Sequence, residues 1–258
     1  MHFVETNEAR IPALGFGTYR LDDDGAERMV SEALEIGYRH IDTAQMYGNE
    51  AGVGRAIRNS GVDRGEIFLT TKVWPNDFER ERLLAAMQDS LDKLGLEYVD
   101  LVLLHWPSAS VPLRETISAL NASRERGDTR HIGVSNFEPD LLLEAAGMSD
   151  APIINNQVEY HPFKSQRPVL EEARSQGISL TAYRPLANGR IYGNETLRQI
   201  AEAHDKEEGQ IALRWLVQQQ SVIAIPKTAN PERARSNFDI FDFELSGEEM
   251  SSIDALAR

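Results

Sequence analysis

The chain has 258 residues, of which 41% are hydrophobic and 26% are charged, and it contains no cysteine. This length and composition suit one domain with a sizeable core, and the missing cysteines exclude thiol catalysis, disulfides, iron–sulfur clusters and cysteine-ligated zinc. The formal net charge of −14 argues against a nucleic-acid or membrane partner, because binding to phosphates needs an electropositive surface.

Neither a signal peptide nor a membrane span is expected from the sequence. Residues 1–10 lack the basic and then apolar pattern of a signal peptide. The longest apolar stretch lies near residues 99–104 and is far too short to cross a bilayer. A cytoplasmic location is therefore expected.

Short apolar runs of strand length alternate with amphipathic segments of helical length along the chain. The predicted strands are Leu14–Phe16, His40–Asp42, Ile67–Lys72, Val99–His105, His131–Ser135, Ile154–Gln157, Ser179–Tyr183 and Val222–Ile225. The predicted helices are Glu27–Ile36, Glu50–Asn59, Arg80–Leu94, Leu113–Glu125, Asp140–Ala146, Val169–Ser175, Thr196–Ala203, Gln210–Gln219, Pro231–Asn237 and Gly247–Leu256. Several helices are followed by a glycine that can end them, namely Gly37, Gly95, Gly127 and Gly177.

This alternation predicts the α/β class, with a parallel sheet and right-handed crossovers. Eight strand–helix units in 258 residues fit a closed (β/α)₈ TIM barrel better than an open doubly wound sheet. We expect a single domain over residues 1–258. Its first 13 residues would cap the barrel floor, and the last two predicted helices would be additions near the C-terminus.

Polar side chains lie at the C-terminal ends of the first few predicted strands. Asp42, Lys72 and His105 each end a strand, and Tyr47 follows Asp42 by five residues. Each residue alone has an ordinary structural explanation, such as a helix cap, packing or a solvated strand end. Because barrels of this type gather their reactive groups at one face, we expect the four side chains to converge there.

Together these four side chains suit proton donation to a carbonyl oxygen. Tyrosine is a weak acid with an ordinary pKa of about 10, and a nearby ammonium lowers that pKa by favouring the phenolate. Lys72 would tune Tyr47 in this way, Asp42 would hold Lys72 charged, and His105 would orient the substrate. Because no side chain donates hydride, the electron pair must come from a cofactor.

The motifs around these residues resemble those of the aldo-keto reductase family, in the same order and over nearly the whole chain. They are G-F-G-T-Y-R at 15–20, G-Y-R-H-I-D-T-A-Q-M-Y-G-N-E at 37–50, T-K-V-W at 71–74, L-H-W-P at 104–107, G-V-S-N-F at 133–137, N-Q-V-E-Y-H-P at 156–162 and I-P-K-T at 225–228. Within the family, the sequence is most similar to short bacterial reductases of the 2,5-diketo-D-gluconate reductase and methylglyoxal reductase type.

The resemblance implies NADPH-dependent reduction of aldehydes and ketones to alcohols, with Tyr47 as general acid in a tetrad with Asp42, Lys72 and His105. Small dicarbonyls such as methylglyoxal, or keto sugars such as 2,5-diketo-D-gluconate, are the implied substrates. The implied NADPH/NADP⁺ contacts are Thr18; Ser135, Asn136 and Gln157 at the carboxamide; Tyr183 stacked on the nicotinamide; Arg184, Leu186 and Ala187 along the pyrophosphate; Lys227, Thr228 and Arg233 around the 2′-phosphate; and Asn237 at the adenine.

Aromatic residues next to the reactive positions are expected to wall the substrate site with His105. These residues are Tyr19, Trp74 and Trp106, whereas Phe137 has equal grounds for packing in the core. No metal site is expected, because the six histidines form neither H-E-x-x-H nor H-x-H. No G-x-G-x-x-G follows a strand, so a Rossmann dinucleotide site is not expected either.

Two other classes of function stay open at this point. A Schiff-base lyase would use Lys72 as its amine, since barrel aldolases place a lysine at a strand end. A cofactor-sensing, non-catalytic subunit would bind NADPH without turnover. A monomer is expected by analogy with other barrels of this type.

Overall fold

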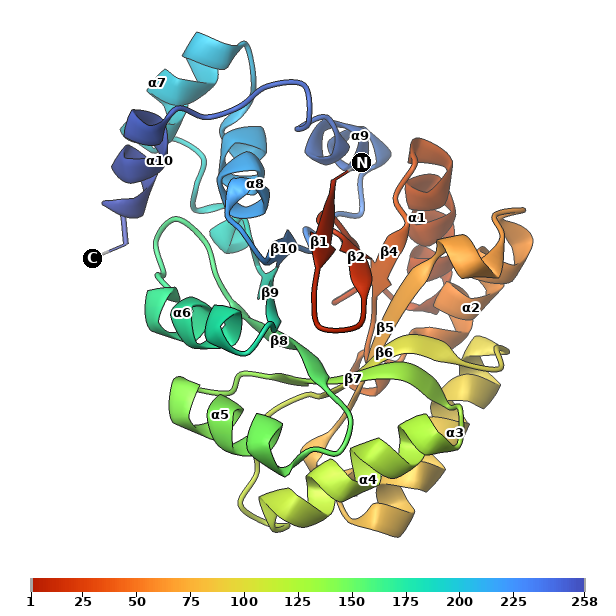
Figure 1. Ribbon diagram of the computed structural model, residues 1–258. Helices are drawn as coiled ribbons and strands as arrows, with labels where there is room; N and C mark the ends of the chain where they lie inside the picture. The colour runs from red at the N-terminus through yellow and green to blue at the C-terminus, as the bar shows by residue number, and fades with distance from the viewer. Residues whose placement is uncertain (1, 258) are drawn as a thin grey trace.

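The computed structural model describes residues 2–257, and its centre is a sheet of eight parallel strands (Figure 1). Neighbours in the sheet are also neighbours in chain order, as repeated strand–helix crossovers require. The strands are β3 (Phe16–Gly17), β4 (His40–Asp42), β5 (Phe68–Val73), β6 (Val99–Leu104), β7 (Thr129–Ser135), β8 (Ile153–Glu159), β9 (Ser179–Tyr183) and β10 (Val222–Ala224).

The segment before β3 closes the sheet against β10. Leu14 forms a parallel bridge with Ala224, and the backbone N–H of Ala224 donates to the oxygen of Ala13 at 2.9 Å. Gly15 N–H then donates to the oxygen of Ala224 at 2.8 Å. These bonds complete the ring of strands, so the predicted α/β barrel architecture is confirmed.

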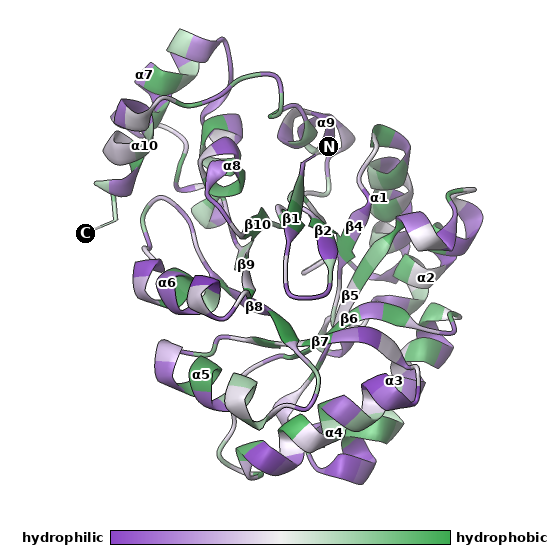
Figure 2. Ribbon diagram, viewed as in Figure 1, coloured by the Kyte–Doolittle hydropathy of each residue, from purple (hydrophilic) through white to green (hydrophobic). Residues whose placement is uncertain are grey.

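Helices surround the ring, with hydrophilic residues on their outer faces and hydrophobic residues toward the strands (Figure 2). None of the helices within residues 2–257 is both long and apolar enough to cross a membrane. The helices are α1 (Asp23–Ile36), α2 (Glu50–Asn59), α3 (Arg80–Leu94), α4 (Leu113–Glu125), α5 (Pro139–Met148), α6 (Arg167–Ser175), α7 (Glu195–His204), α8 (Glu208–Gln218), α9 (Pro231–Phe238) and α10 (Gly247–Asp254). Short 3₁₀ turns are η1 (Gln45–Tyr47), η2 (Arg64–Glu66), η3 (Pro75–Asp77) and η4 (Ala187–Gly189).

The predicted elements are all present, but several of their ends differ by a few residues. Helix α1 begins at Asp23, earlier than the predicted Glu27, because the Asp22 side chain accepts a hydrogen bond from Gly25 N–H and caps the first turn. His105 lies just beyond β6 and Leu14 makes only an isolated bridge, so both fall outside the strands predicted to contain them.

Residues 3–12 form an antiparallel hairpin that the sequence did not predict. Strand β1 (Phe3–Glu5) pairs with β2 (Arg10–Pro12). Asn7 N–H donates to the oxygen of Gly177, which precedes β9, and Glu8 pairs with Arg124 at 2.6 Å. These contacts place the hairpin at the end of the barrel where the strands begin, in front of the ring in Figure 1.

Helix α2 packs so closely on its neighbours that two of its positions admit only glycine. A Cβ at Gly52 would lie 2.0 Å from the oxygen of Asp23 in α1. A Cβ at Gly54 would lie 2.0 Å from the oxygen of Leu94 in α3. This packing fixes the start of α2, which directly follows the turn that carries Tyr47.

We expect Gly54→Ala to lower the free energy of unfolding by about 1–3 kcal/mol, because the added methyl group pushes α2 away from α3. Gly147→Ala is the matched control: a Cβ there meets nothing within 4 Å, and alanine favours helix by up to about 1 kcal/mol. Urea unfolding followed by circular dichroism measures both changes. Equal effects of the two substitutions would contradict the close contact at Gly54.

Candidate active site

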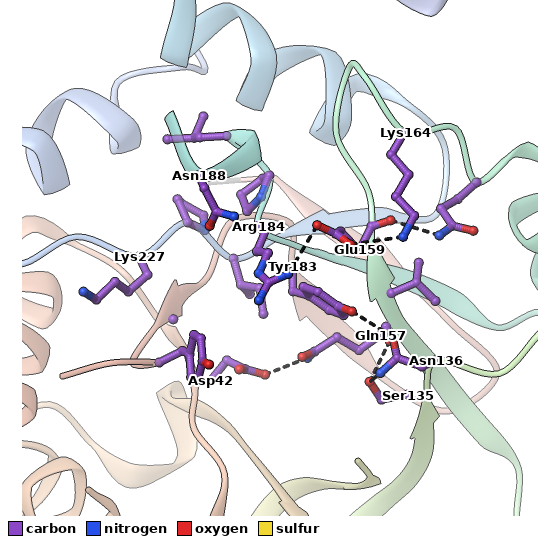
Figure 3. Close-up of a pocket in the computed structure, with 18 of the residues that line it drawn as sticks. Asp42, Ser135, Asn136, Gln157, Glu159, Lys164, Tyr183, Arg184, Asn188 and Lys227 are labelled. Carbon is purple, nitrogen blue, oxygen red and sulfur yellow. Dashed lines mark hydrogen bonds and ion pairs between the residues drawn. The ribbon is translucent and has the colours of Figure 1, made fainter. Parts of the chain in front are cut away.

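A cavity of about 1110 Å³ lies at the end of the barrel where the strands finish, opposite the hairpin. Figure 3 draws residues that line this cavity. Most of the predicted site residues line it, namely Tyr19, Asp42, Tyr47, His105, Trp106, Ser135, Asn136, Gln157, Tyr183, Arg184, Leu186, Lys227, Thr228, Arg233 and Asn237. The structure therefore brings together side chains that are far apart in the sequence.

Five other predicted residues are not part of the cavity lining, and most of them support it from behind. Thr18 is fully buried, and its hydroxyl donates to the backbone oxygen of Asp42 at 3.1 Å. Lys72, Ala187 and Phe137 are also buried, which places Phe137 in the core rather than in the substrate wall. Trp74 is half-buried, and its ring meets that of His105 edge-on at 5.1 Å.

Lys72 and Asp42 form a buried ion pair beneath the cavity. Lys72 Nζ donates to Asp42 Oδ1 at 2.6 Å, to Thr43 O at 2.7 Å and to Tyr47 Oη at 3.4 Å. The side chains of Lys72 and Asp42 are 0% and 2% exposed. An ammonium has three N–H groups, and each has an acceptor here, as burial of the charge requires.

A buried asparagine fixes the loop that carries Tyr47. Asn49 Oδ1 accepts from the Thr43 hydroxyl at 2.8 Å, and its Nδ2 donates to the oxygens of Thr18 at 3.0 Å and Leu21 at 2.9 Å. The loop after β4 is thereby tied to the loop after β3. This bracing holds the phenol of Tyr47 against Lys72.

Burial raises the pKa of the Tyr47 phenol above its ordinary value, and the opposing effect of Lys72 does not cancel the rise. Lys72 acts on the Tyr47 pKa in the expected downward direction, but desolvation outweighs the ammonium, so the net shift is upward. Burial also disfavours the charged form of Lys72, but Asp42 and Tyr47 outweigh it and leave the lysine pKa raised. The site thus holds a neutral phenol beside a charged ammonium.

His105 follows β6 and is a neutral imidazole at the edge of the tetrad. Its ring meets Tyr47 edge-on, with ring centroids 5.7 Å apart. Burial, followed by the charge of Lys72, lowers the pKa of His105 to about 3. Its Nδ1 is buried without a hydrogen-bond partner among the described residues, so Nε2 is the ring nitrogen available to a ligand in the cavity.

Four predicted cofactor residues form a connected row along the cavity wall (Figure 3). The Ser135 hydroxyl donates to the backbone oxygen of Gln157 at 2.7 Å, and the Tyr183 hydroxyl donates to Asn136 Oδ1 at 2.9 Å. Gln157 Nε2 donates to Asp42 Oδ2 at 2.7 Å. The row is therefore joined directly to the ion pair of the tetrad.

Three cations, Arg20, Lys227 and Arg233, line another part of the cavity. Burial, together with the charge of Arg20, lowers the pKa of Lys227. Two other cations of the cavity, Lys164 and Arg184, are paired with Glu159, but within residues 2–257 no ion pair includes Arg20, Lys227 or Arg233. An anion in the cavity would therefore find unpaired positive charge here.

Sequence reasoning gave no role to several cavity residues. Arg20 ends the motif G-F-G-T-Y-R, and Glu159 lies inside N-Q-V-E-Y-H-P, so both were marked by their motifs. Glu159 pairs with Arg184 at 3.5 Å and with Lys164 at 3.0 Å. Lys164 lies in an irregular loop, where no strand or helix pattern indicates its direction.

The profile of the Aldo/keto reductase family matches residues 13–258. The chain belongs to this family. A glyoxal reductase of Bacillus subtilis (strain 168) is 43% identical over 253 residues, which are 98% of this chain and 91% of that protein.

Solved structures of the family agree with the barrel. A crystal structure described as a 2,5-diketo-D-gluconic acid reductase B has 52% sequence identity and a TM-score of 0.98, over 100% of this chain and 92% of that one. A Bombyx mori aldo-keto reductase in complex with NADP has 35% identity and a TM-score of 0.93, over 99% and 92% of the two chains. The family resemblance of the motifs is thus confirmed.

Two buried neutral histidines link the stability of this reductase-family barrel to pH. Burial lowers the pKa of His40 from 6.5 to about 4, and burial with Lys72 lowers that of His105 from 6.5 to about 3. Below pH 6.5 the unfolded chain therefore takes up protons that the folded protein does not. The stability that depends on these groups is fully present above that pH and is lost as the pH falls toward the folded pKa values.

We expect the free energy of unfolding to fall between about pH 6.5 and pH 4, and to fall less steeply in His105→Gln, which removes one of the two histidines. Urea unfolding of wild type and variant at matched pH values measures this, and the carboxylates common to both cancel in the difference. Parallel curves for the two proteins would show that His105 is not held neutral.

Proposed function

We propose that this protein reduces aldehydes and ketones to alcohols, with NADPH as the source of hydride and Tyr47 as the proton donor. The observation that carries the proposal is the 3.4 Å contact between Tyr47 Oη and the buried ammonium of Lys72. Membership of the Aldo/keto reductase family supports the same class of reaction.

The tetrad can deliver a proton to a carbonyl oxygen. Burial keeps Tyr47 protonated until a substrate is present, and the proton then leaves from Oη. The phenol oxygen becomes negative as the proton leaves, and Lys72 stabilises that charge where little water competes. Asp42 keeps Lys72 charged, and neutral His105 can donate a hydrogen bond through Nε2 to orient the carbonyl oxygen.

The residues along the cavity fit a nicotinamide dinucleotide phosphate. Tyr183 offers a flat ring at the end of β9, and the amides of Asn136 and Gln157 suit a carboxamide. Lys227 and Arg233 offer unpaired positive charge for the 2′-phosphate that distinguishes NADPH from NADH. When bound, this cofactor supplies the hydride that no side chain can. The Bombyx mori relative, solved with NADP, supports this choice.

Small dicarbonyls such as methylglyoxal and keto sugars such as 2,5-diketo-D-gluconate are the substrates we propose. The names of the glyoxal reductase and of the 2,5-diketo-D-gluconic acid reductase support these two groups. The rim beside Tyr47 consists of exposed Tyr19, Met46 and Trp106. An open apolar rim of this kind tolerates substrates of varied size.

The geometry favours the reductase over a Schiff-base lyase. An imine-forming lysine must present an uncharged amine to its substrate. Lys72 is fully buried, all three of its N–H groups are engaged, and its pKa is raised. A cofactor-sensing subunit without turnover would not need the complete tetrad that this cavity contains.

We expect Tyr47→Phe to lower kcat at least about 100-fold while leaving the Kd for NADPH unchanged. The substitution removes the proton donor but leaves the cavity residues proposed to bind the cofactor, such as Tyr183 and Gln157. Turnover of methylglyoxal and a fluorescence titration with NADPH measure the two quantities. Tyr98→Phe, which removes a hydroxyl bonded to Arg130 at the opposite end of the barrel, should change neither. Full turnover in Tyr47→Phe would remove Tyr47 from the acid role.

We expect Lys227→Met to weaken NADPH binding about 10- to 100-fold, as loss of a charged hydrogen bond implies, and to change NADH binding little. Titrations of both cofactors measure this. Lys93→Met, which removes a lysine exposed on α3, is the control for the loss of one positive charge. Equal weakening of the two cofactors would contradict a 2′-phosphate site at Lys227.

A further inference from the structure

The side-chain amide of Gln157 has a fixed orientation, because Asp42 can form a hydrogen bond with its NH₂ group but not with its oxygen. Gln157 Nε2 donates to Asp42 Oδ2 at 2.7 Å (Figure 3). Asp42 Oδ1 accepts from Lys72 Nζ at 2.6 Å. An ionised carboxylate has acceptors and no donor, so the glutamine must turn its NH₂ toward it. Both residues are buried, with Gln157 3% and Asp42 1% exposed, so water does not replace this bond.

The amide oxygen of Gln157 is therefore the atom left for the cavity, which this residue lines. The neighbouring amide of Asn136 has both N–H groups in use, since its Nδ2 donates to Ser135 Oγ and His105 O, and its Oδ1 already accepts one hydrogen bond from Tyr183. Gln157 Oε1 accepts no hydrogen bond from the described residues, so it is the acceptor with both lone pairs open to a ligand N–H group.

We propose that Asp42 is a positioning residue for the cofactor as well as for the acid. By fixing the Gln157 amide, Asp42 makes the wall accept an N–H group on the pyridine ring, and so selects a carboxamide over a substituent that lacks this donor. This inference rests on the proposed function. One carboxylate then serves two partners, because it orients Lys72 beside Tyr47 and Gln157 beside the ring that gives the hydride.

The substitution Asp42→Asn should reverse the orientation of the Gln157 amide without changing the size of the side chain at position 42. The ammonium of Lys72 can donate only to the oxygen of the new amide, so the nitrogen of that amide faces Gln157. Gln157 must then turn its own oxygen toward position 42 and its NH₂ toward the cavity. A carboxamide and an acetyl group both carry a carbonyl oxygen that this NH₂ can bind, so discrimination between them should disappear.

The test compares NADP⁺ with its 3-acetylpyridine analogue, in which a methyl group replaces the amide NH₂. Dissociation constants are measured by quenching of protein fluorescence without a carbonyl substrate, so the readout does not depend on turnover. Wild type should bind NADP⁺ about 3- to 10-fold more tightly than the analogue, as one uncharged hydrogen bond implies. Asp42→Asn should bind the two with equal affinity.

Tyr47→Phe is the matched control, because it disables the same tetrad but leaves Asp42 and Gln157 in place. It should keep the wild-type ratio of the two dissociation constants. A general loosening of the site would weaken both ligands together and leave the ratio unchanged. Asp42→Asn with the wild-type ratio would overturn the inference.

A second variant keeps the test decisive if Asp42→Asn does not fold, as judged by circular dichroism and thermal unfolding. Asp42→Leu combined with Lys72→Met leaves no unpaired buried charge and no acceptor at position 42 to orient the Gln157 amide. Either side of that amide can then face the cavity, so the ratio should also fall toward one; a retained wild-type ratio would overturn the inference. Equal, tight binding of both dinucleotides by wild type would overturn the role of Asp42 and leave the proposed function standing. Failure of wild type to bind either dinucleotide would overturn the proposed function itself.

Discussion

The charged ammonium of Lys72, buried at the end of the barrel, is the constraint on which the site depends. Removing such an ion from water costs several kcal/mol unless a counter-ion and hydrogen bonds replace its hydration. Asp42, the backbone of Thr43 and the phenol of Tyr47 supply these partners. All three belong to β4 or the turn after it, so strand β5 can carry its lysine only when the neighbouring strand and turn are in place.

The burial that makes this arrangement costly also makes it useful. Desolvation raises the pKa of Tyr47, so the proposed acid keeps its proton. Desolvation also strengthens the attraction between Lys72 and any negative charge that forms on the phenol. Asp42 makes both effects possible, because without the carboxylate the lysine would lose its charge. Gln157 joins this centre to the proposed cofactor site through the second oxygen of the same carboxylate.

The elements that the sequence predicted well are those with strong local signals. Helices α2, α3 and α4 begin and end where predicted, because their apolar periodicity is regular and α3 is followed directly by Gly95. The convergence of Asp42, Lys72 and His105 followed from their places at strand ends, since a parallel barrel gathers these ends at one face. Tyr47 followed from its place in the short turn after β4. The β1–β2 hairpin was missed because its strands have only three residues each, too few to show a period of two.

Features that depend on tertiary contact could not be predicted from the chain. The sign of the Tyr47 pKa shift depends on how deeply the phenol is buried, which the spacing of residues does not reveal. The bond between Gln157 and Asp42 joins residues 115 positions apart. The closing bridge between Leu14 and Ala224 also forms only when the whole ring is assembled. In each case the sequence shows which residue is present, but the neighbours that surround the residue are brought together only by folding.

A titration of Tyr47 itself examines the balance between burial and Lys72 most directly. The protein is labelled with tyrosine carrying ¹³C at Cζ, and the Tyr47 resonance is assigned by its loss in Tyr47→Phe. Because burial outweighs the ammonium, the resonance should stay at the position of a neutral phenol throughout the neutral range and up to about pH 10, the ordinary tyrosine pKa. A phenolate resonance at neutral pH would show instead that Lys72 outweighs burial, and that the acid does not hold its proton before substrate arrives.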